Sequence, residues 1–164
     1  MDLLILRHGK AGERVMGVPD DERTLTTKGT RDIRGVARWM SRTGSVPDLI
    51  VSSPVPRARE TAEIVGERIA FPGEIAFWEE LRPGSSVGDL LPRLGDLDGA
   101  SLPLLVGHEP LLSSLVPALI GAGEGARILI GKGGMARIGN LSQNPEGGGE
   151  LQWLLTVRQM RDMG

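Results

Sequence analysis

The chain has 164 residues, a formal net charge of −2 and no cysteine. This length suits one compact domain, and we expect residues 1–164 to form it. The small net charge argues against general affinity for nucleic acid, and the lack of cysteine excludes disulfides, zinc thiolates and a cysteine nucleophile. The sequence shows no secretion signal and no apolar run long enough for a membrane span. We therefore expect a cytoplasmic protein with neither nucleic acid nor membrane as a partner.

Apolar runs and helical periodicity alternate along the chain. Strands are predicted at residues 2–6, 48–51, 73–77, 102–106, 127–130, 135–141 and 151–157. Helices are predicted to begin at Thr26 or Thr27, after the sequence Ser52-Ser53-Pro54, at Ser86 and at Pro110. The last two strands resemble a hairpin across residues 144–149. This pattern predicts an α/β fold: a three-layer α/β/α sandwich with a mostly parallel central sheet and an antiparallel carboxyl-terminal edge hairpin.

Both histidines of the chain, His8 and His108, come directly after predicted strands. Arg7 precedes the first histidine, and Arg57 lies in the first turn of a predicted helix, off its core face. Because ligands of open α/β sheets bind outside the carboxyl ends of the strands, we expect these four side chains to meet at one edge.

Two arginines and two histidines near helix amino termini suit a dianion, since guanidinium groups bind phosphate oxygens in pairs and helix ends add N–H donors. A neutral imidazole is also a competent nucleophile at pH 7, because its ordinary pKa is about 6.5. The pattern therefore indicates a phosphoryl group as ligand and allows His8 to attack phosphorus.

Four motifs in this order resemble the histidine phosphatase superfamily, and most closely its small SixA-type phosphohistidine phosphatases. They are Leu6-Arg7-His8-Gly9, the stretch from Arg23 to Gly29, the stretch from Ser52 to Ala62, and Val106-Gly107-His108-Glu109-Pro110. The ending Gly149-Glu150-Leu151-Gln152-Trp153 is also similar, so the resemblance covers nearly the whole chain.

The resemblance implies a role for each site residue. His8 would accept the phosphoryl group, and Arg7, Arg57 and His108 would form the phosphate pocket. Arg23 would be an additional donor from the loop at residues 11–23. Hydrolysis of the phosphohistidine would complete a two-step reaction that needs no metal and no cofactor.

The general acid is the part of the family pattern that does not carry over cleanly. Larger relatives protonate the leaving oxygen with an acidic residue, for which this chain offers Glu80 or Glu109. We favour Glu80. A phosphohistidine substrate needs a strong acid less than a phosphate ester does, because its imidazole leaving group can already be protonated.

The expected substrate is a phosphohistidine on a phosphorelay protein, since the span from residue 69 to residue 102 is short for the lid of larger relatives. Two alternatives remain open: a small-molecule phosphatase or mutase, and a phosphate-binding module without turnover. The stretch Gly131-Lys132-Gly133-Gly134 is interpreted as a turn, because Ala126 replaces the first glycine of a nucleotide-binding loop.

Overall fold

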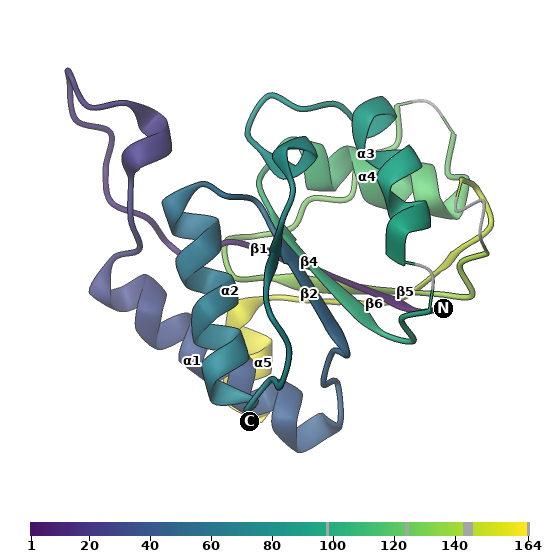
Figure 1. Ribbon diagram of the computed structural model, residues 1–164, viewed down its shortest axis with the longest axis horizontal. Helices are drawn as coiled ribbons and strands as arrows, with labels where there is room; N and C mark the ends of the chain where they lie inside the picture. The colour runs from purple at the N-terminus through teal and green to yellow at the C-terminus, as the bar shows by residue number, and fades with distance from the viewer. Residues whose placement is uncertain (98, 124, 143–145, 164) are drawn as a thin grey trace.

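The computed structural model describes residues 1–97, 99–123, 125–142 and 146–163 (Figure 1). These residues contain a six-stranded sheet with the order β3-β2-β4-β1-β5-β6. Its strands are β1 (Leu3–Arg7), β2 (Leu49–Ser52), β3 (Ala76–Phe77), β4 (Pro103–Gly107), β5 (Met135–Gly139) and β6 (Glu150–Leu155). The first four are parallel, whereas β5 runs antiparallel to both β1 and β6. The predicted fold class is therefore confirmed.

Helices cover both faces of the sheet (Figure 1). One face carries α1 (Thr27–Thr43), α2 (Pro56–Arg68) and α5 (Val157–Met163), and the other carries α3 (Val87–Arg93) and α4 (Leu111–Ile120). Three short 3-10 helices, η1 (Asp20–Glu22), η2 (Glu79–Leu81) and η3 (Leu94–Leu97), lie in the connections. Within the described residues, no helix is long and apolar enough to cross a membrane.

Strand β1 shows how the sequence produces this layering. Successive side chains of a strand point to opposite faces, so Leu3 and Ile5 enter the core under α3 and α4. Leu4 and Leu6 enter the core under α1, α2 and α5. A strand buried on both faces is a continuous apolar run, and β1 has to lie in the interior of the sheet.

The predicted helix ends are mostly confirmed. Thr26 caps α1 by accepting the Gly29 N–H at 3.0 Å, and Ser86 forms the expected capping box of α3. Helix α2 differs in detail, because Pro56 and not Pro54 lies in its first turn and no serine caps it. Ser53 is instead available to the site described below.

Three predicted strands need correction. Residues 127–130 are no strand: the Ile128 N–H donates to the Ser113 carbonyl at 3.3 Å, and the Ile130 N–H donates to the carboxylate of Glu109 at 3.2 Å. The predicted edge strand at 73–77 pairs only over Ala76–Phe77. The last strand ends at Leu155, and the chain continues as the unpredicted helix α5. Residues 143–145, part of the predicted hairpin turn, lie outside the described residues.

Candidate active site

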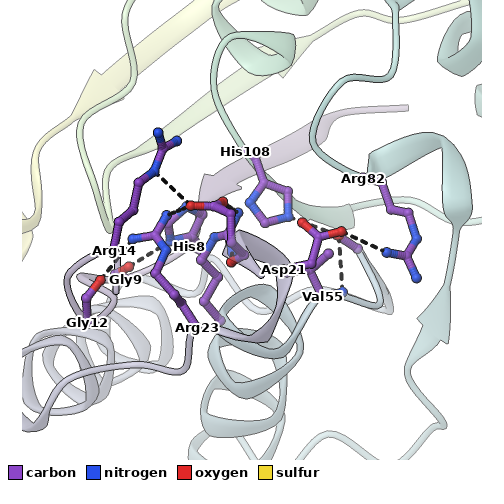
Figure 2. Close-up of polar contacts among 12 residues, drawn as sticks. His8, Gly9, Gly12, Arg14, Asp21, Arg23, Val55, Arg82 and His108 are labelled. Atoms are coloured by element: carbon purple, nitrogen blue, oxygen red, sulfur yellow. Dashed lines mark hydrogen bonds and ion pairs between the residues drawn. The ribbon is translucent and has the colours of Figure 1, made fainter. Parts of the chain in front are cut away.

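The two histidines meet because β1 and β4 are neighbours that end together. Arg7 is in register with Gly107, and the His8 N–H donates to the Gly107 carbonyl at 3.1 Å. The ring centroids of His8 and His108 are 4.9 Å apart. Figure 2 shows the two histidines together with the ion pair between Asp21 and Arg82, whose atoms are 3.3 Å apart. The predicted convergence of His8 and His108 at one edge of the sheet is present.

Backbone contacts fix the chain on both sides of His8. The Gly133 N–H lies 3.1 Å from the carbonyl oxygens of both Arg7 and His8. On the other side, the Gly9 N–H donates to Thr61 Oγ1 at 3.1 Å, and that hydroxyl donates to the Arg57 carbonyl at 2.7 Å. The nucleophile candidate is thus tied to the first turns of α2, which carry Arg57.

His8 is buried and held in one tautomer. Its Nδ1 lies 2.7 Å from the Gly9 carbonyl oxygen, which can only accept, so Nδ1 carries the proton and Nε2 keeps its lone pair. Burial lowers the pKa of His8 to about 4, and the positive charges of Arg57, Arg7 and Lys132 act in the same direction. The imidazole is neutral at pH 7, as a nucleophile requires.

His108 is also buried, with a different partner. Its Nε2 lies 2.9 Å from Ser53 Oγ, while its Nδ1 has no hydrogen-bond partner within the described part of the chain. Burial lowers the pKa of His108 to about 2, with further lowering by His8, Arg57 and Arg7. Both imidazoles are therefore neutral before an anion enters.

Arg7 is anchored from the far side of the site. Its Nη1 donates to the Ile130 carbonyl at 2.9 Å, and its buried Nε has no partner among the described residues. The segment at 127–130 that replaces a predicted strand is thus a support for this guanidinium. The N–H donors of Arg7 that Ile130 does not use can bind another acceptor.

Arg57 and Arg23 meet at the carboxylate of Asp20. The side chain of Arg57 is only 4% exposed, and its Nη2 lies 3.1 Å from Asp20 Oδ2. Arg23 Nη2 lies 2.7 Å from Asp20 Oδ1, and Arg14 Nε lies 2.9 Å from the same oxygen. Arg57 lies in the first turn of α2, as predicted, and its guanidinium lies under the 11–25 segment. In this structure the arginine cluster already binds an anion, which is the side-chain carboxylate of Asp20.

The model of the histidine phosphatase superfamily, branch 1, matches residues 3–84. The chain is also 32% identical over 121 residues to the phosphohistidine phosphatase SixA of Escherichia coli K12, covering 73% of this chain and 74% of that protein. This chain belongs to the histidine phosphatase superfamily.

Solved structures agree with this assignment. The protein histidine phosphatase SixA complexed with tungstate superposes on this histidine phosphatase with a TM-score of 0.86 and 27% identity, covering 98% of this chain and 99% of that one. A mycobacterial glucosyl-3-phosphoglycerate phosphatase in complex with VO3 shares the fold, with a TM-score of 0.72 and 20% identity over 94% of this chain and 99% of that chain.

The two acidic candidates of this histidine phosphatase have other partners. Glu80 lies in η2, and its Oε1 is 3.3 Å from Arg93 Nε of α3. Glu109 accepts the Ser113 N–H at 3.1 Å with one oxygen and the Ile130 N–H with the other. Glu109 therefore serves as a double acceptor that holds the segment supporting Arg7. Among the described contacts, no hydrogen bond or ion pair joins Glu80 to either histidine.

Sequence patterns assigned no role to three residues of this histidine phosphatase site: Ser53, Lys132 and Asp20. Ser53 belongs to the motif from Ser52 to Ala62, and its place directly after β2 is the position where site residues gather. The turn at Lys132 was correctly read as a turn, but its charge acts on His8 and it has no polar partner among the described residues. The described residues include no group of three or more His, Cys, Asp or Glu side chains that could hold a metal ion.

Proposed function

We propose that the chain is a phosphatase that works through a phosphohistidine at His8. The observation that carries this proposal is the state of His8: a neutral, buried imidazole whose Nδ1–H is engaged by the Gly9 carbonyl, so that Nε2 is the free nucleophilic atom. The lone pair of Nε2 forms the bond to phosphorus while the bond from phosphorus to the leaving atom breaks. The leaving group keeps that electron pair and takes up a proton.

The second step returns the protein to its first state. Water attacks the phosphorus of the phosphohistidine, the P–N bond breaks, and inorganic phosphate leaves. Between the two steps the ring at His8 carries a positive charge, which the hydrogen bond from Nδ1 to the Gly9 carbonyl stabilises. Burial opposes that charge in the free protein, but the attached phosphoryl group supplies compensating negative charge.

Arg7, Arg57 and His108 are proposed to bind the phosphoryl oxygens, with Arg23 as an additional donor. Preorganised donors that face a transferring phosphoryl group lower the barrier, because the charge on its equatorial oxygens is stabilised without rearrangement. His108 fits this role through Nδ1, the ring nitrogen that Ser53 leaves free. Glu80 remains our candidate for the general acid, and it would have to leave Arg93 to act.

As substrate we propose a phosphohistidine on a phosphorelay protein. The chain is similar to proteins named phosphohistidine phosphatases, and the described residues between β3 and β4 form two 3-10 helices and the short α3. A small connection there suits a phosphoryl group that is presented by another protein. The second candidate is a small-molecule phosphomonoester, which the shared fold of the glucosyl-3-phosphoglycerate phosphatase supports.

A trapping experiment tests the covalent intermediate. Brief incubation with p-nitrophenyl phosphate that carries a labelled phosphoryl group, followed by denaturation, should leave label on the protein. The N–P bond should be labile in acid and stable in base, whereas serine and threonine phosphate esters survive acid. His8→Ala should abolish both trapping and hydrolysis.

The matched variant His108→Ala should still form label, but more slowly, because His108 is assigned to charge stabilisation and not to bonding. Label that persists in His8→Ala, or that maps to His108, would refute the nucleophile. Binding of phosphate without any hydrolysis would point to a binding module. Comparing kcat/KM for a phosphohistidine protein, sugar phosphates and nucleotides then separates the two substrate classes.

A further inference from the structure

One residue of the 11–25 segment occupies both terminal nitrogens of Arg57. The Asp20 carbonyl accepts Arg57 Nη1 at 2.7 Å, and Asp20 Oδ2 accepts Arg57 Nη2 at 3.1 Å. The other carboxylate oxygen is shared by Arg23 and Arg14. Asp20 therefore makes with Arg57 the two-point contact that guanidinium groups make with phosphate.

A second anion would have to share the guanidinium of Arg57 with Asp20. Its side chain is 4% exposed, whereas that of Asp20 is 34% exposed, so the carboxylate is the partner that can move. Among the described residues, the remaining nitrogen, Nε, is buried and makes no hydrogen bond. A phosphoryl group that makes the same two-point contact with Nη1 and Nη2 of Arg57 has to take the place of Asp20.

The Asp20 carboxylate also acts electrostatically on the histidine pair. Its negative charge is among those that influence the pKa of His108, in the direction opposite to the arginines. Burial raises the pKa of Asp20 itself, but Arg23, Arg57 and Arg14 outweigh this effect, so the pKa lies below its ordinary value. The group is a carboxylate throughout the neutral range.

We propose that Asp20 is an internal competitor of the substrate phosphoryl group at Arg57, and that it thereby sets which anions the site admits. The inference rests on the proposed function, because it takes Arg57 as a phosphate ligand. A phosphoryl dianion displaces the carboxylate because it can also use the donors of Arg7 and His108, which Asp20 does not contact. A ligand with one negative charge and two oxygens gains less and is excluded.

The 11–25 segment can release Asp20 while the contacts between its two ends stay in place. Ala11 pairs with Leu25 in an isolated antiparallel bridge, and the Gly12 N–H donates to the Thr24 carbonyl at 3.0 Å. Asp21 makes its ion pair with Arg82 at 3.3 Å, and among the described contacts no hydrogen bond or ion pair joins it to Arg57, although its charge acts to raise the pKa of Arg57. Asp21 is thus a neighbouring residue of the same charge whose ion pair lies with another arginine.

Calorimetric titration with inorganic phosphate tests the competition without requiring turnover. Asp20→Asn removes the charge and should bind phosphate about tenfold tighter than the unmodified protein, because a phosphoryl group no longer has to displace a carboxylate from Arg57 Nη2. Asp20→Ala should do the same. Asp21→Asn removes one charge from the adjacent residue and measures the general electrostatic gain, which we expect to stay below about threefold.

Each other outcome has a defined meaning. Equal tightening in Asp20→Asn and Asp21→Asn, or weaker binding in Asp20→Asn, would overturn the internal competitor. Arg57→Ala separates this failure from that of the proposed function. If phosphate binding needs Arg57 but Asp20→Asn is no tighter, only the competitor is refuted. If phosphate binds equally well without Arg57, or binds to no variant, the phosphate site fails together with the competitor.

Discussion

At the scale of single residues, the two histidines share burial and neutrality but differ in which ring nitrogen is engaged. His8 uses Nδ1 toward a carbonyl that can only accept, which leaves Nε2 with its lone pair. His108 uses Nε2 toward the Ser53 hydroxyl, which can donate or accept. One fixed tautomer and one adjustable tautomer suit a nucleophile beside an oxygen-binding group.

Imidazole NMR can follow both groups, because the chain contains only two histidines. Burial lowers the pKa of His8 to about 4 and that of His108 to about 2, so neither ring should titrate between pH 5 and pH 8. Bound phosphate should raise both pKa values through its negative charge. A His8 midpoint near 6.5 in the free protein would contradict the described environment, with His8→Ala providing the assignment.

Arg57→Lys separates charge from geometry. Lysine keeps the positive charge but cannot present two parallel N–H donors, so turnover of p-nitrophenyl phosphate should fall by roughly one to three orders of magnitude. Arg59→Lys is the matched control on the same helix, where Arg59 lies over the Phe77 ring at 4.7 Å, and should stay near normal. Normal turnover in Arg57→Lys would show that Arg57 is not part of the phosphate pocket.

At the scale of elements, the sequence predicted the parts that carry the site because apolar strands end abruptly in Arg7-His8-Gly9 and Gly107-His108. It misread residues 127–130 because Ile128-Leu129-Ile130 is a short apolar run, which is typical of a buried strand, whereas Leu129 is 70% exposed in the structure. Their backbone groups bind Ser113, Glu109 and Arg7 instead. The contact of Asp20 with Arg57 spans 37 positions, and no local pattern reports it.

Gly29 of α1 packs against the backbone of Lys10, in the loop that follows His8. A Cβ atom on Gly29 would lie 2.1 Å from the Lys10 carbonyl oxygen, which the Thr26 N–H already holds at 2.9 Å. Gly29→Ala should therefore destabilise the protein by about 1–3 kcal/mol in urea unfolding, despite the better helix propensity of alanine. It should also lower activity, because Lys10 lies two residues after His8.

The control for this prediction is Gly88→Ala in α3, where the only atom near an added Cβ is Ser86 Oγ at 3.6 Å. This variant should be neutral or stabilised by up to about 1 kcal/mol. Equal stability of Gly29→Ala and Gly88→Ala would show that the contact between Gly29 and Lys10 can adjust.

At the scale of the whole molecule, burying two neutral histidines makes stability depend on pH. The folded-state pKa of each lies below the ordinary value of about 6.5, so the unfolded chain binds more protons below neutrality. Stability is therefore fully present above about pH 6.5 and is lost as the pH falls toward the folded-state values.

Urea unfolding between pH 7.5 and pH 4.5 checks this dependence. By pH 4.5, close to its folded-state pKa, His8 should account for a loss of about 2–3 kcal/mol. His8→Gln, which does not titrate, should reduce the dependence over this range by about half, because His108 still contributes. Parallel curves for the two proteins would contradict the lowered pKa of His8.

The position of β1 between β4 and β5 has a consequence for how the protein is made. Residue 4 pairs with residue 104 on one side and with residue 137 on the other, so both neighbours of β1 follow it in the chain at a long sequence distance. Such long-range pairings slow folding, because a large loop must close before any contact is gained. On the ribosome, β1 is made before both of its partner strands, and we expect nascent chains to become reactive at His8 only after β5 has emerged.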